Sequence, residues 1–188
     1  MKVLMHTCCA PCSLSCTDSL KAEGLEVTAY WYNPNIHPWT EYVARRDCLI
    51  SYAESISLPL IVDEDYGLRE FARAVSDDIG GRCSYCYASR LEETAKAAID
   101  GGFDAFTTTL LASPYQNRDK IIALGEELGK KYGVEFLPRD FRPNFREGNA
   151  RAKELGLYMQ KYCGCIFSEE DRYLKKINAD RERFAQNK

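Results

Sequence analysis

Val3-Leu-Met-His-Thr-Cys-Cys-Ala-Pro-Cys12 is the stretch that decides the fold. Its first residues form a short apolar run, which predicts a strand over residues 3–6. From Cys12 onward, apolar residues recur three or four positions apart, which predicts a helix over residues 12–22. A strand that passes through a short loop into a helix is the first half of a βαβ unit, and Cys8 and Cys9 occupy that loop.

The same alternation of apolar runs and helical segments continues along the rest of the chain. Further strands are predicted at residues 27–32, 60–63, 105–108 and 135–138. Further helices are predicted at residues 41–57, 67–75, 85–100, 117–132, 146–158 and 169–185. This pattern predicts an α/β fold with a parallel five-stranded sheet flanked by helices, whose ligands bind at the carboxyl ends of the strands.

The length and composition of the chain indicate one folded unit. Its 188 residues have the size of one domain, so we expect a single domain over residues 1–188, ending in a helix at about 168–186. A hydrophobic content of 45% excludes a disordered chain. The residues after Met1 lack the apolar run of a secretory signal, and no stretch is apolar enough to span a membrane, so we expect a cytoplasmic protein.

The charge of the chain says little about its partners. With 25 Lys and Arg against 28 Asp and Glu, the net charge is −3, so a nucleic-acid contact requires a local basic patch. The densest positive stretch contains Arg139, Arg142, Arg146 and Arg151. These arginines would either contact phosphates or form a solvated helix flank.

Nine cysteines are the strongest departure from average composition. An odd number cannot all form disulfides, and a reducing cytoplasm favours metal binding or redox chemistry. Six of the nine form close pairs in predicted connections, namely Cys8-Cys9, Cys83-x2-Cys86 and Cys163-Gly-Cys165. For the other three, Cys12, Cys16 and Cys48, packing in apolar helix faces is the simpler interpretation. Cys12 is the first exception to consider, because it is close enough to Cys8 and Cys9 either to support the ligands without binding the metal or to act as a substitute ligand.

Cys83-x2-Cys86 has the spacing of a metal chelate at the start of a helix, where the helix dipole stabilises thiolates. A metal site usually takes four ligands, and Cys8-Cys9 is the best complement. Adjacent cysteines chelate one metal atom poorly but can reach two different irons, so the four sulfurs favour an iron–sulfur cluster. The alternative is a zinc site with four thiolates. It is less favoured because such zinc sites prefer two well-spaced cysteine pairs, and we count only one here.

Cys163-Gly-Cys165 requires a separate explanation. A disulfide between these residues would close a small, strained ring and would be easily reduced, which suits redox exchange. The same thiolates could instead hold a second metal beside the cluster, and the sequence does not decide between the two. Two redox-capable sulfur sites favour reductive chemistry over a purely structural metal.

Five motifs stand out together. They are Thr7-Cys8-Cys9-Ala-Pro-Cys12-Ser13, Tyr32-Asn33-Pro34-Asn35-Ile36-His37-Pro38, Arg82-Cys83-x-x-Cys86-Tyr87, Thr107-Thr108-Thr109-Leu110-Leu111-x-Ser113-Pro114-Tyr115 and Tyr162-Cys163-Gly164-Cys165. Their combination resembles the QueH family, the cobalamin-independent epoxyqueuosine reductases. The resemblance runs from Met1 to about Ser168 and is far more specific than any single motif.

The resemblance implies a Rossmann-like (HUP-like) sheet, a 4Fe-4S cluster and an adjacent redox or metal site. The implied reaction is the two-electron reductive deoxygenation of the epoxide of epoxyqueuosine at the tRNA wobble position, which gives queuosine in the last step of its synthesis in tRNA. The implied partners are that tRNA and an electron donor that the sequence does not identify. The implied site residues are Cys8, Cys9, Cys83 and Cys86 for the cluster, with Cys163 and Cys165 as the catalytic redox-active pair or the ligands of a second, mononuclear iron.

A base in a single-stranded anticodon loop can be stacked on aromatic side chains. Trp31, Tyr32 and Trp39 flank a loop suited to this role. The polar residues within that loop would either hydrogen-bond the base or form a turn that caps the next helix; they are Asn33, Asn35 and His37.

Two other functions fit parts of the sequence. A PP-loop ATP-dependent tRNA sulfur transferase shares such a sheet but needs a glycine-rich phosphate loop, whereas the first loop here has no glycine and leads to Pro11. A non-catalytic zinc module that binds RNA would be colourless and free of iron.

Overall fold

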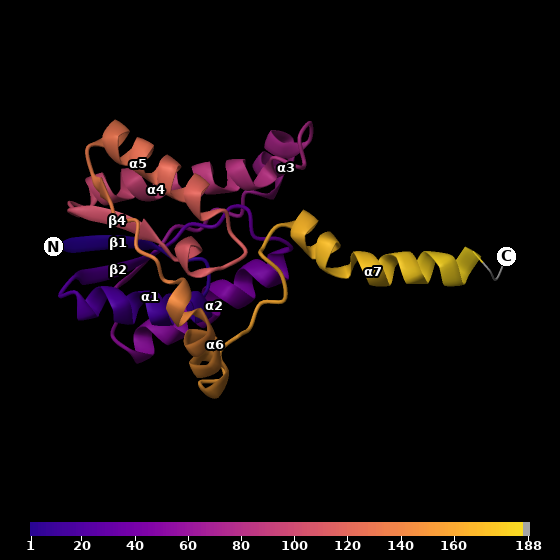
Figure 1. Cartoon of the computed structure of the whole chain (residues 1–188), viewed down its shortest axis with the longest axis horizontal. Helices are drawn as coiled ribbons and strands as arrows, with labels where there is room; N and C mark the ends of the chain where they lie inside the picture. The colour runs from indigo at the N-terminus through magenta and orange to yellow at the C-terminus, as the bar shows by residue number, and fades with distance from the viewer. Residues whose placement is uncertain (186–188) are drawn as a thin grey trace.

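A parallel sheet forms the centre of the protein in the computed structural model, which describes residues 1–185 (Figure 1). In chain order the described strands are β1 (Lys2–His6), β2 (Glu26–Trp31), β3 (Leu60–Val62), β4 (Ala105–Thr108) and β5 (Glu135–Phe136). They pair in parallel in the order β3-β2-β1-β4-β5. The predicted α/β fold with a five-stranded parallel sheet is therefore confirmed.

Helices cover both faces of the sheet. They are α1 (Ala10–Ala22), α2 (Trp39–Ser55), α3 (Leu68–Val75), α4 (Arg82–Asp100), α5 (Arg118–Tyr132), α6 (Phe145–Glu154) and α7 (Ile166–Ala185). In Figure 1, α4 and α5 lie on one face, and α1, α2 and α6 lie on the other. Every predicted helix is present in the described part of the chain. The last residue of the helix predicted at about 168–186 lies outside the described residues.

Two helix boundaries differ from prediction in ways that affect the site. Helix α4 begins at Arg82 rather than at residue 85, so Cys83, like Cys86, lies within its first turns and not in the loop before it. Helix α6 ends at Glu154 rather than at residue 158, because Gly156 adopts a φ of 68°. A glycine in this left-handed conformation commonly terminates a helix. The residues after Gly156 are thereby free to cross to the carboxyl end of the sheet.

The order of the strands places a crevice next to β1. The chain moves outward from β1 to β2 and β3, then returns to the other side of β1 to form β4. In sheets of this kind, ligands bind outside the carboxyl ends of the strands at the point where the direction changes. The side chains of Val3, Leu4 and Met5 are fully buried, as expected for a central strand covered on both faces. The residues just after His6 and Thr108 are therefore the ones that this fold presents to a ligand.

Helix α7 extends away from the rest of the molecule (Figure 1). None of its described residues is buried. Among residues 1–185, no helix has both the length and the apolar character required to cross a membrane.

Candidate metal centre and active site

Three sulfur atoms meet where β1 leads into α1. The Sγ atoms of Cys8, Cys9 and Cys12 all lie within 4.8 Å of one another. Cys9 has an extended backbone and directly precedes α1, and Pro11 in the first turn needs no hydrogen-bond partner for its nitrogen. Cys12 therefore points back toward the two cysteines of the loop. Three soft sulfur ligands in one place suit iron or zinc, so this group is a candidate metal-binding site.

The three thiols of this group are not equivalent. Hydrogen bonds from Cys12 and Cys9 hold the pKa of Cys8 well below its usual value. The hydrogen bond to Cys8 raises the pKa of Cys12, and burial raises that of Cys9. Cys8 is thus the sulfur that this environment favours as a thiolate, which is the form that binds metals.

Polar side chains from distant parts of the chain surround the same sulfurs. The Thr109 hydroxyl, which follows β4, lies 3.5 Å from Cys8 Sγ and also accepts a hydrogen bond from the Cys8 backbone N–H at 3.3 Å. The Gln160 side-chain amide donates to Cys9 Sγ at 3.1 Å and lies 3.7 Å from Cys12 Sγ. Donors of this kind orient metal ligands and stabilise their negative charge.

The Cys83-x2-Cys86 pair lies on α4, outside the group of three sulfurs. Cys83 is exposed, whereas Cys86 is buried. Cys86 Sγ accepts hydrogen bonds from Arg90 Nη2 at 2.8 Å and from Asn35 Nδ2 at 3.1 Å. Burial raises the pKa of Cys86 to about 12, and the Arg90 charge acts against this.

The Cys163-Gly-Cys165 loop lies close to the start of α4. Burial raises the pKa of Cys83, and the charge of Cys163 raises it further. Cys163 is exposed and its Sγ accepts a hydrogen bond from Gln116 Nε2 at 3.3 Å. Cys165 is buried in a small apolar cluster with Phe71. Cys12 thus lies beside Cys8 and Cys9, and the start of α4 with Cys83 and Cys86 lies near the Cys163 loop.

Gly164 gives the Cys163–Cys165 loop its shape. Its φ of 158° is one that other residues rarely adopt, and a Cβ at this position would lie 3.2 Å from Ile36 Cγ1. The Gly164 carbonyl accepts a hydrogen bond from the His37 backbone N–H at 2.8 Å. Its N–H donates to the Ser168 hydroxyl at 3.1 Å. The loop is therefore held against the residues that precede α2 and against the start of α7.

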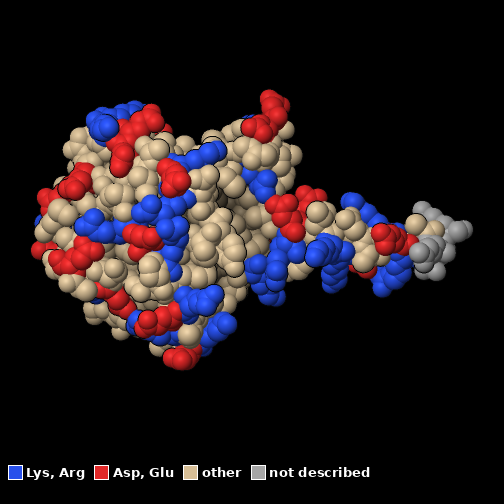
Figure 2. Space-filling view, in the orientation of Figure 1, with Lys and Arg blue, Asp and Glu red and all other residues tan. Residues whose placement is uncertain are grey.

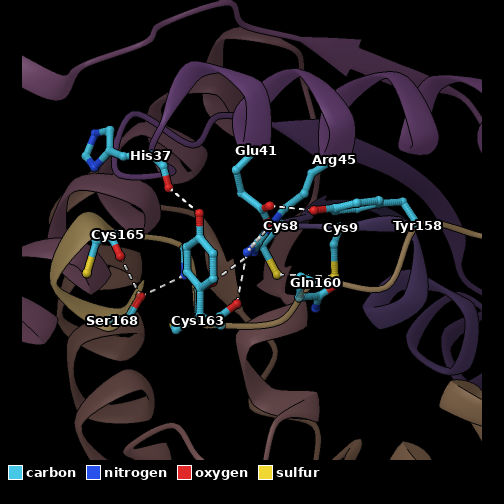
Figure 3. A network of polar contacts seen from close by, with 12 residues as sticks. Cys8, Cys9, His37, Glu41, Arg45, Tyr158, Gln160, Cys163, Cys165 and Ser168 are labelled. Atoms are coloured by element: carbon cyan, nitrogen blue, oxygen red, sulfur yellow. Dashed lines mark hydrogen bonds and ion pairs between the residues drawn. The ribbon is translucent and has the colours of Figure 1, made fainter. Parts of the chain in front are cut away.

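Arg45 connects this loop to helix α2 (Figure 3). Its guanidinium donates to the carbonyl oxygens of Cys163 and Tyr162 at 2.8 and 2.9 Å. It also pairs with Glu41 at 2.7 Å, and Glu41 accepts a hydrogen bond from the Tyr158 hydroxyl at 2.5 Å. The side chains of Arg45 and Glu41 are 1% and 8% exposed, so water cannot replace these contacts.

Replacement of Arg45 by methionine should therefore lower the free energy of unfolding substantially. The Glu41 carboxylate would remain buried without its cation, and the loss of one partner of a buried ion pair typically costs about 3–5 kcal/mol. Urea denaturation of the two proteins measures the difference. Arg46→Met on the same helix is the control, because Arg46 pairs with exposed acids and such pairs contribute about 0–1 kcal/mol. Equal losses in the two variants would show that the buried pair has no special importance.

His37 gives the folded protein a specific sensitivity to acid. Burial lowers its pKa from 6.5 to about 4, and its imidazole packs against Tyr66 and Phe71. Between these two pH values the unfolded chain binds a proton that the folded chain excludes, so stability falls as the pH decreases. His37 should contribute a loss of about 2 kcal/mol between pH 7 and pH 5. Urea titrations at both pH values should show a smaller loss for His37→Gln, and an unchanged loss would contradict the prediction.

A cavity of about 470 Å³ opens beside the sulfur atoms. Cys8, Cys12, Arg90 and Cys163 contribute to its lining. Its other lining residues come from distant segments of the chain and include Thr109, Tyr115, Gln116, Phe145, Asn149, Lys153, Gln160 and Lys161. It lies at the carboxyl ends of β1 and β4, so the site occupies the crevice that the strand order predicts.

Other predicted binding residues have structural roles. Trp31 is fully buried and donates to the Tyr42 hydroxyl at 3.0 Å. The prediction that Trp31 stacks on a base is therefore wrong. Asn33 donates to the Thr7 carbonyl at 3.0 Å, and His37 Nε2 lies 3.1 Å from the Pro34 carbonyl, so these residues shape the turn before α2. Three of the four arginines pair with acids, namely Arg139 with Glu23, Arg142 with Asp140 and Arg151 with Asp18.

Sequence reasoning missed several residues of the site. The packing interpretation holds for Cys16, which is fully buried in the main core, but it is incomplete for Cys12. A signal for Cys12 was present, because Cys9-Ala-Pro-Cys12 is itself a Cys-x2-Cys pair and the chain therefore has two of them. Arg45 and Gln160 carried no local signal, since their importance comes from contacts with distant segments. Arg90 was missed although it lies one helical turn after Cys86, to which it donates a hydrogen bond.

Comparisons with known proteins agree with the motifs. The sequence profile of a family described as "Epoxyqueuosine reductase QueH" matches residues 3–171. A relative of that name from Dehalococcoides mccartyi is 36% identical over 174 residues, which is 93% of this chain and 96% of the relative. Another from Thermotoga maritima is 38% identical over 190 residues, covering 96% and 97% of the two chains.

Similarity to solved structures supports the fold. The U34-tRNA thiolase NcsA from Methanococcus maripaludis, solved with its 4Fe-4S cluster, superposes with a TM-score of 0.58 at 16% identity. The alignment covers 97% of this chain and 67% of the thiolase, and at this identity it is evidence for the fold alone. The sequence matches extend over nearly the whole chain and include all five motifs. This chain therefore belongs to the epoxyqueuosine reductase QueH family.

Proposed function

We propose that this chain is an oxidoreductase that reduces the epoxide of epoxyqueuosine at the tRNA wobble position to the alkene of queuosine. The reaction consumes two electrons and two protons, breaks both C–O bonds of the epoxide and releases water. The observation that carries the proposal is the position of the Cys8, Cys9 and Cys12 sulfurs beside a cavity at the carboxyl edge of the sheet, in a chain of this family. Because its substrate is a tRNA, we propose that the chain acts in the cytoplasm.

The donor set supports an iron–sulfur centre. Buried sulfurs, one of them favoured as a thiolate, are the ligands that such clusters use. We propose a 4Fe-4S cluster held by Cys8, Cys9, Cys83 and Cys86, with Cys12 competing for one ligand position. The cluster, when bound, supplies electrons one at a time. The reaction needs a second reducing site, which we propose to be Cys163 and Cys165, as a dithiol or as ligands of a mononuclear iron.

The outer part of the cavity fits a nucleotide drawn from a single-stranded loop. The Tyr115 ring is 86% exposed and lies edge-on to Phe145 at 6.4 Å between ring centroids. Lys153 and Lys161 line the same cavity. Aromatic rings stack on bases and lysines bind phosphates, so these groups suit an anticodon loop. Lys and Arg side chains also lie over α6 and along α7 on the face in Figure 2.

The direct test is carried out without oxygen and measures both the cofactor content and the reaction in the same protein. The purified chain is analysed for iron and sulfide, reconstituted with both, and incubated with dithionite and tRNA that contains epoxyqueuosine. Nucleoside mass spectrometry should show conversion to queuosine that depends on iron loading. Iron-loaded protein that leaves epoxyqueuosine intact would contradict the proposal, and so would colourless protein that binds zinc and excludes iron.

A further inference from the structure

Arg90 is an unusual arginine because its guanidinium is buried and pairs with no carboxylate among residues 1–185. It lies on α4, and the residue is 1% exposed. Its Nη2 donates to Cys86 Sγ at 2.8 Å. Among the described residues, its Nε and Nη1 have no hydrogen-bond partner although both are buried.

A buried cation of this kind needs negative charge nearby. A guanidinium is always protonated, and the transfer of an unpaired ion out of water costs several kcal/mol. The buried Glu41 carboxylate does not supply the charge, since it pairs with Arg45 on a different helix. The atoms that share the cavity lining with Arg90 include the sulfurs of Cys8, Cys12 and Cys163.

The geometry points to Arg90 as a positioning residue that supplies the counter-charge of the metal–thiolate centre and stabilises its reduced state. This inference rests on the iron–sulfur centre of the proposed function. When the centre accepts one electron from an external reductant, its charge becomes more negative by one. A fixed positive charge next to Cys86 lowers the energy of that state more than the energy of the oxidised one.

The inference predicts a change in reduction potential and not only in activity. Arg90→Gln removes the charge and keeps two hydrogen-bond donors, so the potential of the centre should become more negative. Arg90→Lys keeps the charge without the planar guanidinium, so its potential should stay closer to that of the wild type. Arg90→Met provides a second neutral variant if a buried amide prevents folding.

The experiment is a potentiometric titration of the reconstituted protein, followed by electron paramagnetic resonance, at equal iron content per chain. The matched control is Arg142→Gln, which removes the same charge from an exposed arginine that pairs with Asp140. The expected result is a more negative potential for the neutral Arg90 variants and no shift for the control. An unchanged potential in an iron-loaded neutral variant would overturn the inference, and so would a wild-type chain without reducible iron.

This measurement separates the inference from the proposed function. A shift in potential in protein that does not convert epoxyqueuosine would leave Arg90 as the counter-charge and remove the proposed reaction. Conversion of epoxyqueuosine with no shift in potential would support the proposed reaction and overturn the role of Arg90 as counter-charge.

Discussion

Replacement of Cys8 or Cys9 by serine should abolish both iron binding and the reduction of epoxyqueuosine. The two sulfurs are buried and converge with Cys12 within 4.8 Å, and Cys8 lines the cavity. A serine hydroxyl remains protonated at neutral pH and is a poor ligand for iron, so each substitution removes a thiolate from the centre. Iron and sulfide analysis after anaerobic reconstitution, followed by nucleoside mass spectrometry of treated tRNA, measures both effects.

The control for these variants is Cys48→Ser. Cys48 lies on α2, is half-buried and accepts a hydrogen bond from the Tyr158 backbone N–H at 3.3 Å, so its loss should leave iron content and activity near those of the wild type. The Cys12→Ser variant tests whether Cys12 occupies one of the four ligand positions of the cluster. Full iron content in that variant favours Cys83 and Cys86 as the other ligands, whereas loss of iron places Cys12 in the cluster. A Cys83→Ser/Cys86→Ser double variant with full activity would contradict the proposed ligand set.

Replacement of Cys163 or Cys165 by serine should leave iron in place and reduce turnover to background. The first sulfur lines the cavity, and the second is buried beside Phe71. Figure 3 shows Cys165 apart from Cys8 and Cys9, on the side of Ser168. The proposed role of the two sulfurs as a second reducing site is the basis of this expectation. Single-turnover incubation with reduced protein and modified tRNA measures the loss.

Iron content is the readout that tests this division of roles. If Cys163→Ser or Cys165→Ser removes the whole cluster, those residues are cluster ligands and the proposed second reducing site is wrong. Removal of one iron per chain with sulfide content unchanged would instead favour a mononuclear iron at the pair. Ser168→Ala serves as a control, because it removes the hydroxyl that binds the loop at Gly164 and leaves both sulfurs in place.

The first loop of this chain does not have the composition of a phosphate-binding loop. Phosphate loops use glycine so that backbone N–H groups can approach the ligand. Here Cys8, Cys9 and Pro11 occupy that connection, and Thr109 and Gln160 direct their polar groups at sulfur. The same crevice of the sheet therefore presents sulfur ligands, which favours the reductase over a sulfur transferase that uses ATP.

The sequence by itself determined the sheet, the helices and the family. Apolar periodicity is a local property that each segment carries, and the motif around Cys8 and Cys9 follows β1 directly, so both could be read along the chain. The boundaries of α4 and α6 were less certain, since they depend on Gly156 and on contacts made by the helix ends.

Only the tertiary structure decided which side chains meet. Cys12 joins Cys8 because α1 begins at Ala10, immediately after the loop. Arg45 bonds a sulfur-containing loop that is distant in the sequence, and Arg90 shares a cavity lining with Cys8 and Cys163. Such contacts depend on the packing of helices against the sheet, which periodicity does not encode. The unpaired atoms of Arg90 became visible for the same reason, because a charge is known to lack a partner only when its surroundings are known.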